Sequence, residues 1–232
     1  MNYKKLTKNL VKWLKLQLKS ATAKGFVVGL SGGVDSAVVS VLCKMAVNNN
    51  VLGVIMPCYS NPEDLEDALL VAKKFKIKTK VINLESVFDA LAKTLDFDKI
   101  SKKLFVANIK PRLRMLTLYY FANKYNYLVA GTGNKSELTM GYFTKYGDGG
   151  VDILPIGNLL KTEVWELAKY LEIPEKVIYK PPSAGLWEGQ TDEKEMGIKY
   201  KNLDETIVNL EKNNISNCDK KILAKINSAI KK

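Results

Sequence analysis

The sequence has no histidine, and its 232 residues include only three cysteines and two arginines. Without an imidazole, hydrolysis by a Ser-His-Asp triad is excluded. The cysteines, Cys43, Cys58 and Cys218, are scattered and form no CxxC pair, which indicates reduced thiols in a cytoplasmic protein rather than disulfides or structural zinc. No run of about 18 apolar residues occurs, so neither a membrane span nor a membrane partner is expected.

Negative charge is in short supply, because 24 acidic residues face 36 basic ones and the formal net charge is +12. The lysines are spread along the whole chain, and near the N-terminus they interrupt the apolar positions, which is unlike a signal peptide. We interpret the charge as solvated helix faces that also attract phosphorylated substrates, with no nucleic-acid partner. The apolar content of 47% suffices for one core, so a single domain over residues 1–232 is expected.

The most informative stretch joins an apolar, β-type run to an apolar helical run that starts at Ala37. The short polar loop between them, Ser31–Ser36, reads SGGVDS. A strand, a glycine turn and a helix N-terminus aim backbone N–H groups at one point, where phosphate oxygens fit. Gly32 and Gly33 permit positive φ and close approach of a ligand. Neither GxxxxGK[ST] nor GxGxxG is present.

Asp35 is an unusual residue in a phosphate-binding loop unless a cation lies between the two negative groups. Mg²⁺ takes one or two protein carboxylates together with phosphate oxygens, so Asp35 predicts a magnesium ion. The alternative is a plain turn in which Asp35 or Ser36 caps the helix. The six loop residues between a buried strand and an apolar helix favour the nucleotide site.

Apolar strand-like runs alternate with helical patterns along the chain. This alternation predicts an α/β fold with a doubly wound, mostly parallel, five-stranded sheet flanked by helices. Ligands bind such sheets beyond the carboxyl ends of the strands, so the loops 29–36 and 131–137 are expected to converge. The runs read as strands are 26–30, 51–56, 80–84 and 127–130, and the main helical patterns are 4–20, 37–45, 62–75, 86–95 and 108–125.

Four polar, glycine-bearing blocks occupy the second half of the chain. They are too polar for a core, and long irregular segments of this kind are usually functional. The blocks are GTGNKSE at 131–137, GYFTKYGDGG at 141–150, DILPIGNLLKTEV at 152–164 and PPSAGLWEGQTDE at 181–193.

The SGGVDS loop resembles the pyrophosphate loop of the N-type ATP pyrophosphatases, which adenylate a substrate. The four later blocks are similar to those of ammonia-dependent NAD synthetases, over about residues 10–215. This resemblance implies an adenine nucleotide α hydrolase-like fold and the ATP-dependent amidation of deamido-NAD by ammonia to NAD, with release of AMP and pyrophosphate. Glutamine-dependent relatives carry an amidase domain, whereas only a short helix precedes the loop here. The resemblance also implies a homodimer formed through this helix and the helix from about residue 111.

The resemblance assigns roles to individual residues. Catalysis would depend on Asp35, Glu137 and Lys161, with Asp35 and Glu137 holding Mg²⁺. ATP would be bound by Gly29, Leu30, Ser31, Gly32, Gly33, Val34, Asp35, Ser36, Thr132, Lys161 and Ser183. Deamido-NAD would be bound by Arg112, Lys145 and Asp152, while Tyr142, Phe143 and Tyr146 would wall the nicotinate side. Glu188, Gln190 and Asp192 would lie on a mobile lid.

The chain departs from the family pattern at two places, and several alternatives stay open. Serine replaces the usual threonine at Ser183, and the usual C-terminal His-Lys contact to deamido-NAD has no counterpart, because the chain has no histidine. Arg114 is left without a role. Lys161 could be one more surface lysine, Asp152 a turn residue, and Tyr142 and Phe143 core aromatics. The rival functions are a nucleotide- or RNA-binding module without turnover and a tRNA-modifying ATP pyrophosphatase.

Overall fold

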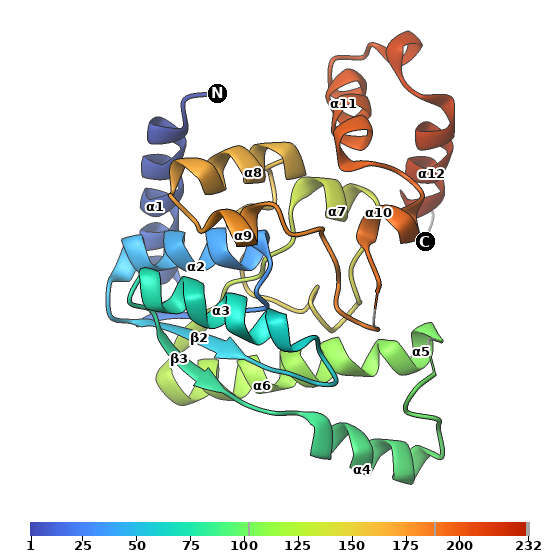
Figure 1. Cartoon of the computed structure of the whole chain (residues 1–232). Coiled ribbons are helices and arrows are strands. Elements are labelled where there is room, and N and C mark those ends of the chain that lie inside the picture. The colour runs from blue at the N-terminus through green and yellow to red at the C-terminus, as the bar shows by residue number, and fades with distance from the viewer. Residues whose placement is uncertain (102, 188, 231–232) are drawn as a thin grey trace.

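The computed structural model describes residues 1–101, 103–187 and 189–230. Its centre is a parallel sheet of four strands in the order β3-β2-β1-β4 (Figure 1). The strands are β1 (Gly25–Gly29), β2 (Val51–Ile55), β3 (Lys78–Val81) and β4 (Tyr127–Val129). The larger helices are α1 (Tyr3–Ser20), α2 (Val34–Val47), α3 (Pro62–Lys74), α4 (Glu85–Leu95), α6 (Ile109–Tyr125), α8 (Lys161–Tyr170), α11 (Tyr200–Glu211) and α12 (Lys220–Ile230). Short helices are α5 (Leu104–Ala107), α7 (Lys135–Thr139), α9 (Glu175–Ile178) and α10 (Asp192–Met196), with one 3₁₀ turn at Ile215–Asn217.

The sheet is buried on both faces, as alternating side chains of β1 show. Phe26 and Val28 join a core formed with α1, α2 and α8, whereas Val27 joins a second core formed with α4 and α6. All three side chains are fully buried. Because both faces are covered, β1 is a continuous apolar run rather than an alternating one. The predicted doubly wound α/β architecture is therefore confirmed.

The prediction of a fifth strand is wrong for the described residues. Where that strand would lie beside β4, the structure has one isolated parallel bridge between Ala130 and Ile153. Gly131 N donates to Ile153 O at 2.8 Å, and Ile153 N lies 3.3 Å from Val129 O. The next donor in such a ladder would be the N–H of residue 155. Pro155 has no N–H, so the ladder stops after one bridge.

The boundaries of several elements differ slightly from the predicted ones. β3 lies at 78–81 rather than 80–84, and the pattern at 108–125 becomes a helix that begins at Ile109 with Pro111 in its first turn. The predicted start of the helix at Pro62 is confirmed, and the Asn61 side chain before it accepts a hydrogen bond from Glu63 N at 3.1 Å. These shifts do not change the topology.

The order of the strands creates a switch point between β1 and β4. From β1 the chain moves outward through β2 to β3, and it then crosses back to place β4 on the other side of β1. A crevice opens at such a point, beyond the carboxyl ends of the two strands. The loops that follow β1 and β4 meet there, since Asn134 Nδ2 donates to Asp35 Oδ1 at 2.9 Å. Their expected convergence is confirmed.

A C-terminal group of helices stands beside the sheet. Figure 1 shows α11 and α12 next to α7 and α10, and α11 contacts both α7 and α8. Tyr200, Leu203 and Ile207 on α11 belong to a separate apolar cluster that also includes Leu160 just before α8. The expectation of a single domain over residues 1–232 stays a prediction.

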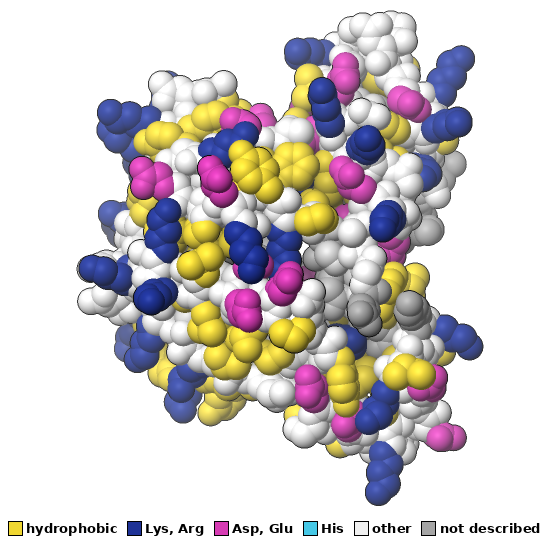
Figure 2. Space-filling view, viewed as in Figure 1, with side chains coloured by type: hydrophobic (Ala, Val, Ile, Leu, Met, Phe, Trp, Pro, Cys, Tyr) yellow, Lys and Arg dark blue, Asp and Glu magenta, His cyan; other side chains and the backbone are white. Residues whose placement is uncertain are grey.

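The surface agrees with the interpretation of the charge. Lys and Arg side chains are dispersed over the visible face, with Asp and Glu side chains among them (Figure 2). Within the described ranges, no helix combines the length and the apolar character that a bilayer crossing requires.

Candidate active site

The loop after β1 has the shape of an anion-binding turn. Gly32 has φ +82°, and a Cβ there would lie 2.4 Å from Asp64 O of α3, so a side chain at this position would clash with backbone. Gly33 is the N-cap residue of α2 and makes no side-chain cap, which leaves backbone N–H groups of the first turn facing the crevice. The alternative in which Asp35 or Ser36 caps the helix is therefore wrong. Ser36 Oγ instead donates to Gly33 O at 2.9 Å and accepts from Ser31 N at 3.2 Å.

The structure brings together the three predicted catalytic residues, which come from three distant segments. Lys161 Nζ is paired with Asp35 Oδ2 and lies 3.4 Å from Glu137 Oε1. The Lys161 side chain is 2% exposed, against 17% for Asp35 and 16% for Glu137. The alternative of a surface lysine is thus wrong. A buried ammonium and two partly accessible carboxylates form one cluster at the mouth of the crevice.

Burial perturbs the pKa values of Glu137 and Lys161. It raises the pKa of Glu137 to about 7, with the Lys161 ammonium opposing the shift and the Asp35 carboxylate adding to it. Burial also lowers the pKa of Lys161, but Asp35 and Glu137 more than reverse this, so the pKa of Lys161 is raised overall. A third acid, Asp192, is buried nearby, and the loss of hydration raises its pKa against the opposing effect of Lys161. Acids therefore outnumber the single ammonium, which makes the cluster attractive to a cation.

The donor set fits Mg²⁺ held together with a polyphosphate. Asp35 and Glu137 offer hard oxygen donors whose side chains are 17% and 16% exposed. No group of three or more Cys, Asp or Glu residues that could hold a metal occurs in the part of the chain that the structure describes. Mg²⁺ is often coordinated by only one or two protein carboxylates, and phosphate oxygens and water occupy its other coordination positions. Asp35 and Glu137 match this pattern.

Glu137 is held by a capping box at the start of α7. Asn134 Oδ1 accepts from Glu137 N at 3.0 Å, and Glu137 Oε2 accepts from Asn134 N at 3.2 Å. This reciprocal pair uses one carboxylate oxygen of Glu137 and leaves Oε1 facing Lys161. The spacing Asn-x-x-Glu is a recognisable cap signature, so the role of Asn134 could have been found in the sequence.

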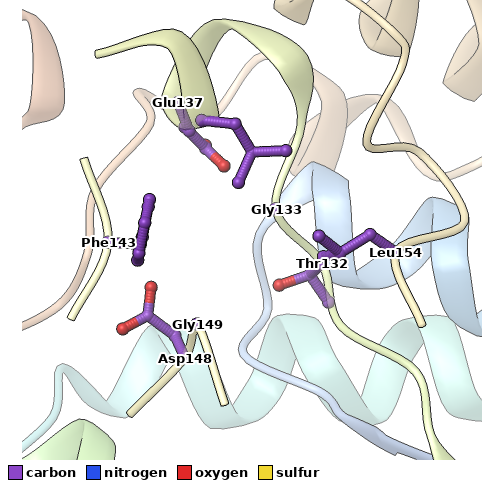
Figure 3. A pocket seen from close by; sticks show the side chains of 8 residues that line it. Thr132, Gly133, Glu137, Phe143, Asp148, Gly149 and Leu154 are labelled. Atoms are coloured by element: carbon purple, nitrogen blue, oxygen red, sulfur yellow. The ribbon is translucent and has the colours of Figure 1, made fainter. Parts of the chain in front are cut away.

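Thr132 lines a cavity of about 110 Å³ that opens beside Glu137. Figure 3 shows Glu137 at one end of this cavity, Asp148 at the other, and Phe143 along its side. Phe143 is 44% exposed, so the alternative of a core aromatic is wrong for it. Ser183, in contrast, is exposed, and its hydroxyl accepts from Gly185 N at 3.1 Å within its own loop. The structure does not bring Ser183 to the phosphate loop.

The three residues predicted to bind deamido-NAD divide into a pair and a single residue. Arg112 is exposed, and its Nε and Nη2 each lie 3.3 Å from Lys145 O, so Arg112 and Lys145 are neighbours. Asp152 faces elsewhere. Its carboxylate accepts from Tyr119 OH at 2.9 Å and from Val129 N at 2.8 Å, which ties the end of β4 to α6.

Tyr142, Tyr146 and Arg114 lie in three different environments. Tyr146 is 67% exposed, with Lys145 Nζ 5.2 Å from its ring centroid. Tyr142 is half-buried and donates to Glu195 Oε2 at 2.7 Å. Arg114 donates to Met56 O at 3.2 Å, which clamps the end of β2 to α6 and gives this residue a structural role.

The predicted lid segment is tied to α10. Gln190 Nε2 donates to Glu195 Oε2 at 2.6 Å, and Gln190 Oε1 accepts from Leu186 N at 2.8 Å. Asp192 accepts from Tyr200 OH at 3.0 Å. Glu188, the third residue assigned to the lid, lies outside the described residues, as do Lys231 and Lys232 at the C-terminus.

Comparison with known proteins identifies the family. The sequence model described as NAD synthase matches residues 6–232. The chain belongs to the NAD synthase family. A curated family member, the NH(3)-dependent NAD(+) synthetase of Carboxydothermus hydrogenoformans, is 59% identical over 206 residues, which cover 88% of this chain and 85% of that protein.

Solved structures of similar proteins have the same fold. The NH3-dependent NAD synthetase of Campylobacter jejuni is 34% identical with a TM-score of 0.84, and the match covers 100% of this chain and 94% of that one. A protein described as NMN synthetase from Francisella tularensis is 39% identical with a TM-score of 0.89, covering 99% and 93%. The resemblance stated from the sequence motifs is therefore confirmed at the level of the family.

The raised pKa of Glu137 predicts a pH-dependent gain in stability on neutralising this residue. Its folded-state pKa of about 7 exceeds the ordinary 4.5, so protonation favours the folded state, and the free energy of unfolding falls as the pH rises between these values. In Glu137→Gln this cost is absent. We expect the variant to match the wild type near pH 5 and to exceed it by roughly 1–3 kcal/mol at pH 8. Thermal melts without ligand or metal measure the difference.

The exposed acid Glu205 supplies the control, because Glu205→Gln should show no such pH-dependent gain. A constant difference between Glu137→Gln and the wild type from pH 5 to pH 8 would contradict the raised pKa.

Proposed function

We propose that this chain is an ammonia-dependent NAD synthetase, which uses ATP and ammonia to convert deamido-NAD to NAD with release of AMP and pyrophosphate. One observation carries the proposal within the family. A phosphate-binding loop, two carboxylates and one buried lysine converge where β1 and β4 end. This combination suits charge development on phosphate oxygens next to a bound cation.

The chemistry needs an activated carboxylate. The nicotinate carboxylate attacks the α-phosphorus of ATP, pyrophosphate leaves, and the resulting acyl adenylate is attacked by ammonia to release AMP. Backbone N–H groups at the start of α2 and the Lys161 ammonium would stabilise the negative charge that develops on the phosphate. Asp35 and Glu137 would hold Mg²⁺, which neutralises phosphate charge when bound. A carboxylate nucleophile needs no general base, which suits a chain without histidine.

The binding roles of the other residues follow the same proposal. Arg112 and Lys145 would hold the anionic dinucleotide, since the two are neighbours and both exposed. Phe143 would wall the nicotinate side, because it lines the cavity beside Glu137. Thr132 lines the same cavity and would contact ATP. Ser183 and Asp152 would contact ATP and deamido-NAD, respectively; in the structure Ser183 accepts from Gly185 N and Asp152 from Tyr119 OH.

We also propose a homodimer formed through α6. Leu116 is 64% exposed and Tyr120 is 58% exposed on the α6 face that also carries Arg112. The N-terminal helix α1 was expected to contribute too, but its apolar side chains Leu14 and Leu18 are already buried in the core of the same chain. A cytoplasmic location is proposed from the three cysteines, which are free and buried.

A second acceptor follows from the likeness to the NMN synthetase of Francisella tularensis. Nicotinate mononucleotide carries the same carboxylate as deamido-NAD and can be activated by the same attack on ATP. It differs by lacking the adenylate half, so the two acceptors test different parts of the binding surface.

The first experiment supplies ATP, Mg²⁺ and ammonium with either deamido-NAD or nicotinate mononucleotide, and measures AMP and the amidated product. We expect AMP and NAD in equal amounts with deamido-NAD. AMP formed only with tRNA would favour a tRNA-modifying pyrophosphatase, and ATP binding without AMP would favour a binding module. A higher kcat/KM with nicotinate mononucleotide would reassign the acceptor.

Asp35→Ala tests the metal assignment. Removing one carboxylate should lower kcat/KM by about 10²–10³-fold and weaken the Mg²⁺ dependence of ATP binding, while the chain stays folded. Steady-state kinetics, calorimetric ATP binding with and without Mg²⁺, and circular dichroism measure the three effects. Retained turnover in Asp35→Ala would remove this residue from the metal site, and Glu205→Ala serves as the matched control.

Leu116→Glu tests the homodimer. A charge on the exposed α6 face should split a dimer that forms there, since burying an unpaired carboxylate is costly. We expect about twice the monomer mass for the wild type and the monomer mass for Leu116→Glu by size exclusion with light scattering. A monomeric wild type at the concentrations used for kinetics would contradict the proposal.

A further inference from the structure

Helix α11 carries a buried carboxylate, Asp204, whose two oxygens both accept hydrogen bonds from helices of the candidate site. Asp204 is 3% exposed. Its Oδ1 accepts a hydrogen bond from the Ser136 hydroxyl of α7, and its Oδ2 accepts from Thr162 N of α8 at 2.8 Å. Ser136 Oγ in turn accepts from Lys161 N at 2.9 Å. One side chain therefore links α7, α8 and α11.

The two helices that Asp204 contacts are those that present Glu137 and Lys161. Ser136 directly precedes Glu137, and Thr162 directly follows Lys161. The N-cap residue of α8 is Leu160, which cannot cap the helix with its side chain. Asp204 and Ser136 satisfy the first N–H groups of α8 in its place, and a carboxylate is favourable at this positive end of a helix. The cap of α8 is thus supplied by two other helices, α7 and α11.

Helix α7 depends on the same link. It has five residues, too few for an isolated helix to be stable in water, so tertiary contacts must hold it. Its capping box fixes the local geometry of Glu137 relative to Asn134 but not the distance from α7 to α8. Two links hold α7 against the start of α8: the chain Asp204–Ser136–Lys161 N, and the hydrogen bond from Lys135 N to Leu159 O at 2.8 Å.

A second side chain of α11, Tyr200, lies against the ammonium group of Lys161. Tyr200 is fully buried and lies four residues before Asp204, on the same face of the helix. The Lys161 ammonium lies 5.1 Å from the Tyr200 ring centroid, and Tyr200 OH donates to Asp192 Oδ2 at 3.0 Å. Asp204 thus holds the backbone of Lys161, while Tyr200 lies against its ammonium.

We propose that Asp204 is a positioning residue that sets the separation of Lys161 and Glu137 through Ser136 and the first turn of α8. The catalytic consequence rests on the proposed function. Because Lys161 acts on charge that develops in the reaction, a displacement of about 1 Å lowers turnover more than substrate binding. A residue that only stabilises the fold would lower the melting temperature and leave the turnover of folded molecules unchanged.

Three variants test this link. In Asp204→Ala, kcat should fall about 10²-fold, whereas KM for ATP and deamido-NAD should change less than about threefold. Asp204→Asn keeps one acceptor for Thr162 N and should lose about tenfold in kcat. Ser136→Ala breaks the same link from its other side, so adding it to Asp204→Ala should lower kcat little further. Kinetics are measured well below the melting temperature and per folded molecule. Glu205→Gln, on the neighbouring exposed residue, should leave kcat unchanged.

A readout independent of activity separates this proposal from the proposed function. Hydrogen exchange by NMR should show the Thr162 and Lys161 amides exchanging at least about tenfold faster in Asp204→Ala, and the Lys161 amide in Ser136→Ala, with other amides of α8 unchanged. If the wild type makes no AMP with either acceptor, the function fails, and this exchange pattern still tests the link. Wild-type kcat per folded molecule in Asp204→Ala, or wild-type exchange at both amides in Asp204→Ala, would overturn the proposal.

Discussion

The site depends on one ammonium held between two carboxylates. Lys161 is almost fully buried, and its charge is stable there only because Asp35 and Glu137 lie against it. The carboxylates in turn exceed the lysine in number, so the cluster keeps a surplus of negative charge that a divalent ion can neutralise. Lys161 makes the burial of Glu137 less costly, whereas the Asp35 carboxylate adds to that cost.

The parallel sheet supplies the geometry for this cluster. Asp35 follows β1, Glu137 follows β4, and Lys161 begins α8, so about 126 residues separate the first from the last. Only the switch between β1 and β4 brings these segments to one edge of the sheet. The glycine at position 32 adds a second constraint, because its backbone packs against Asp64 without room for a side chain. Topology therefore sets which residues meet, and close backbone contact sets the shape of the loop.

Much of this arrangement could be predicted from the sequence. The alternation of strands and helices gave the doubly wound sheet, and two polar strand ends gave the convergence of Asp35 with the loop at 131–137. The prediction of a fifth strand was wrong because Pro155 lacks the N–H that would extend the ladder beyond the single bridge between Ala130 and Ile153. The roles of Asp204 and Tyr200 were not predicted from the sequence. Two polar residues four positions apart occur in many amphipathic helices, and their partners on α7 and α8 are known only once the chain has folded. Such long-range partners carry no local signal.

The cap that α11 gives to α8 also has a consequence for the order in which the chain matures. Ribosomes synthesise a protein from its N-terminus to its C-terminus, and the segments that emerge first can fold first. Asp35, Glu137 and Lys161 all emerge at least about 40 residues before Asp204, so a nascent chain holds all three groups while the start of α8 still lacks its partner. The arrangement of the three groups is then completed late in synthesis, when α11 docks, rather than when the sheet closes.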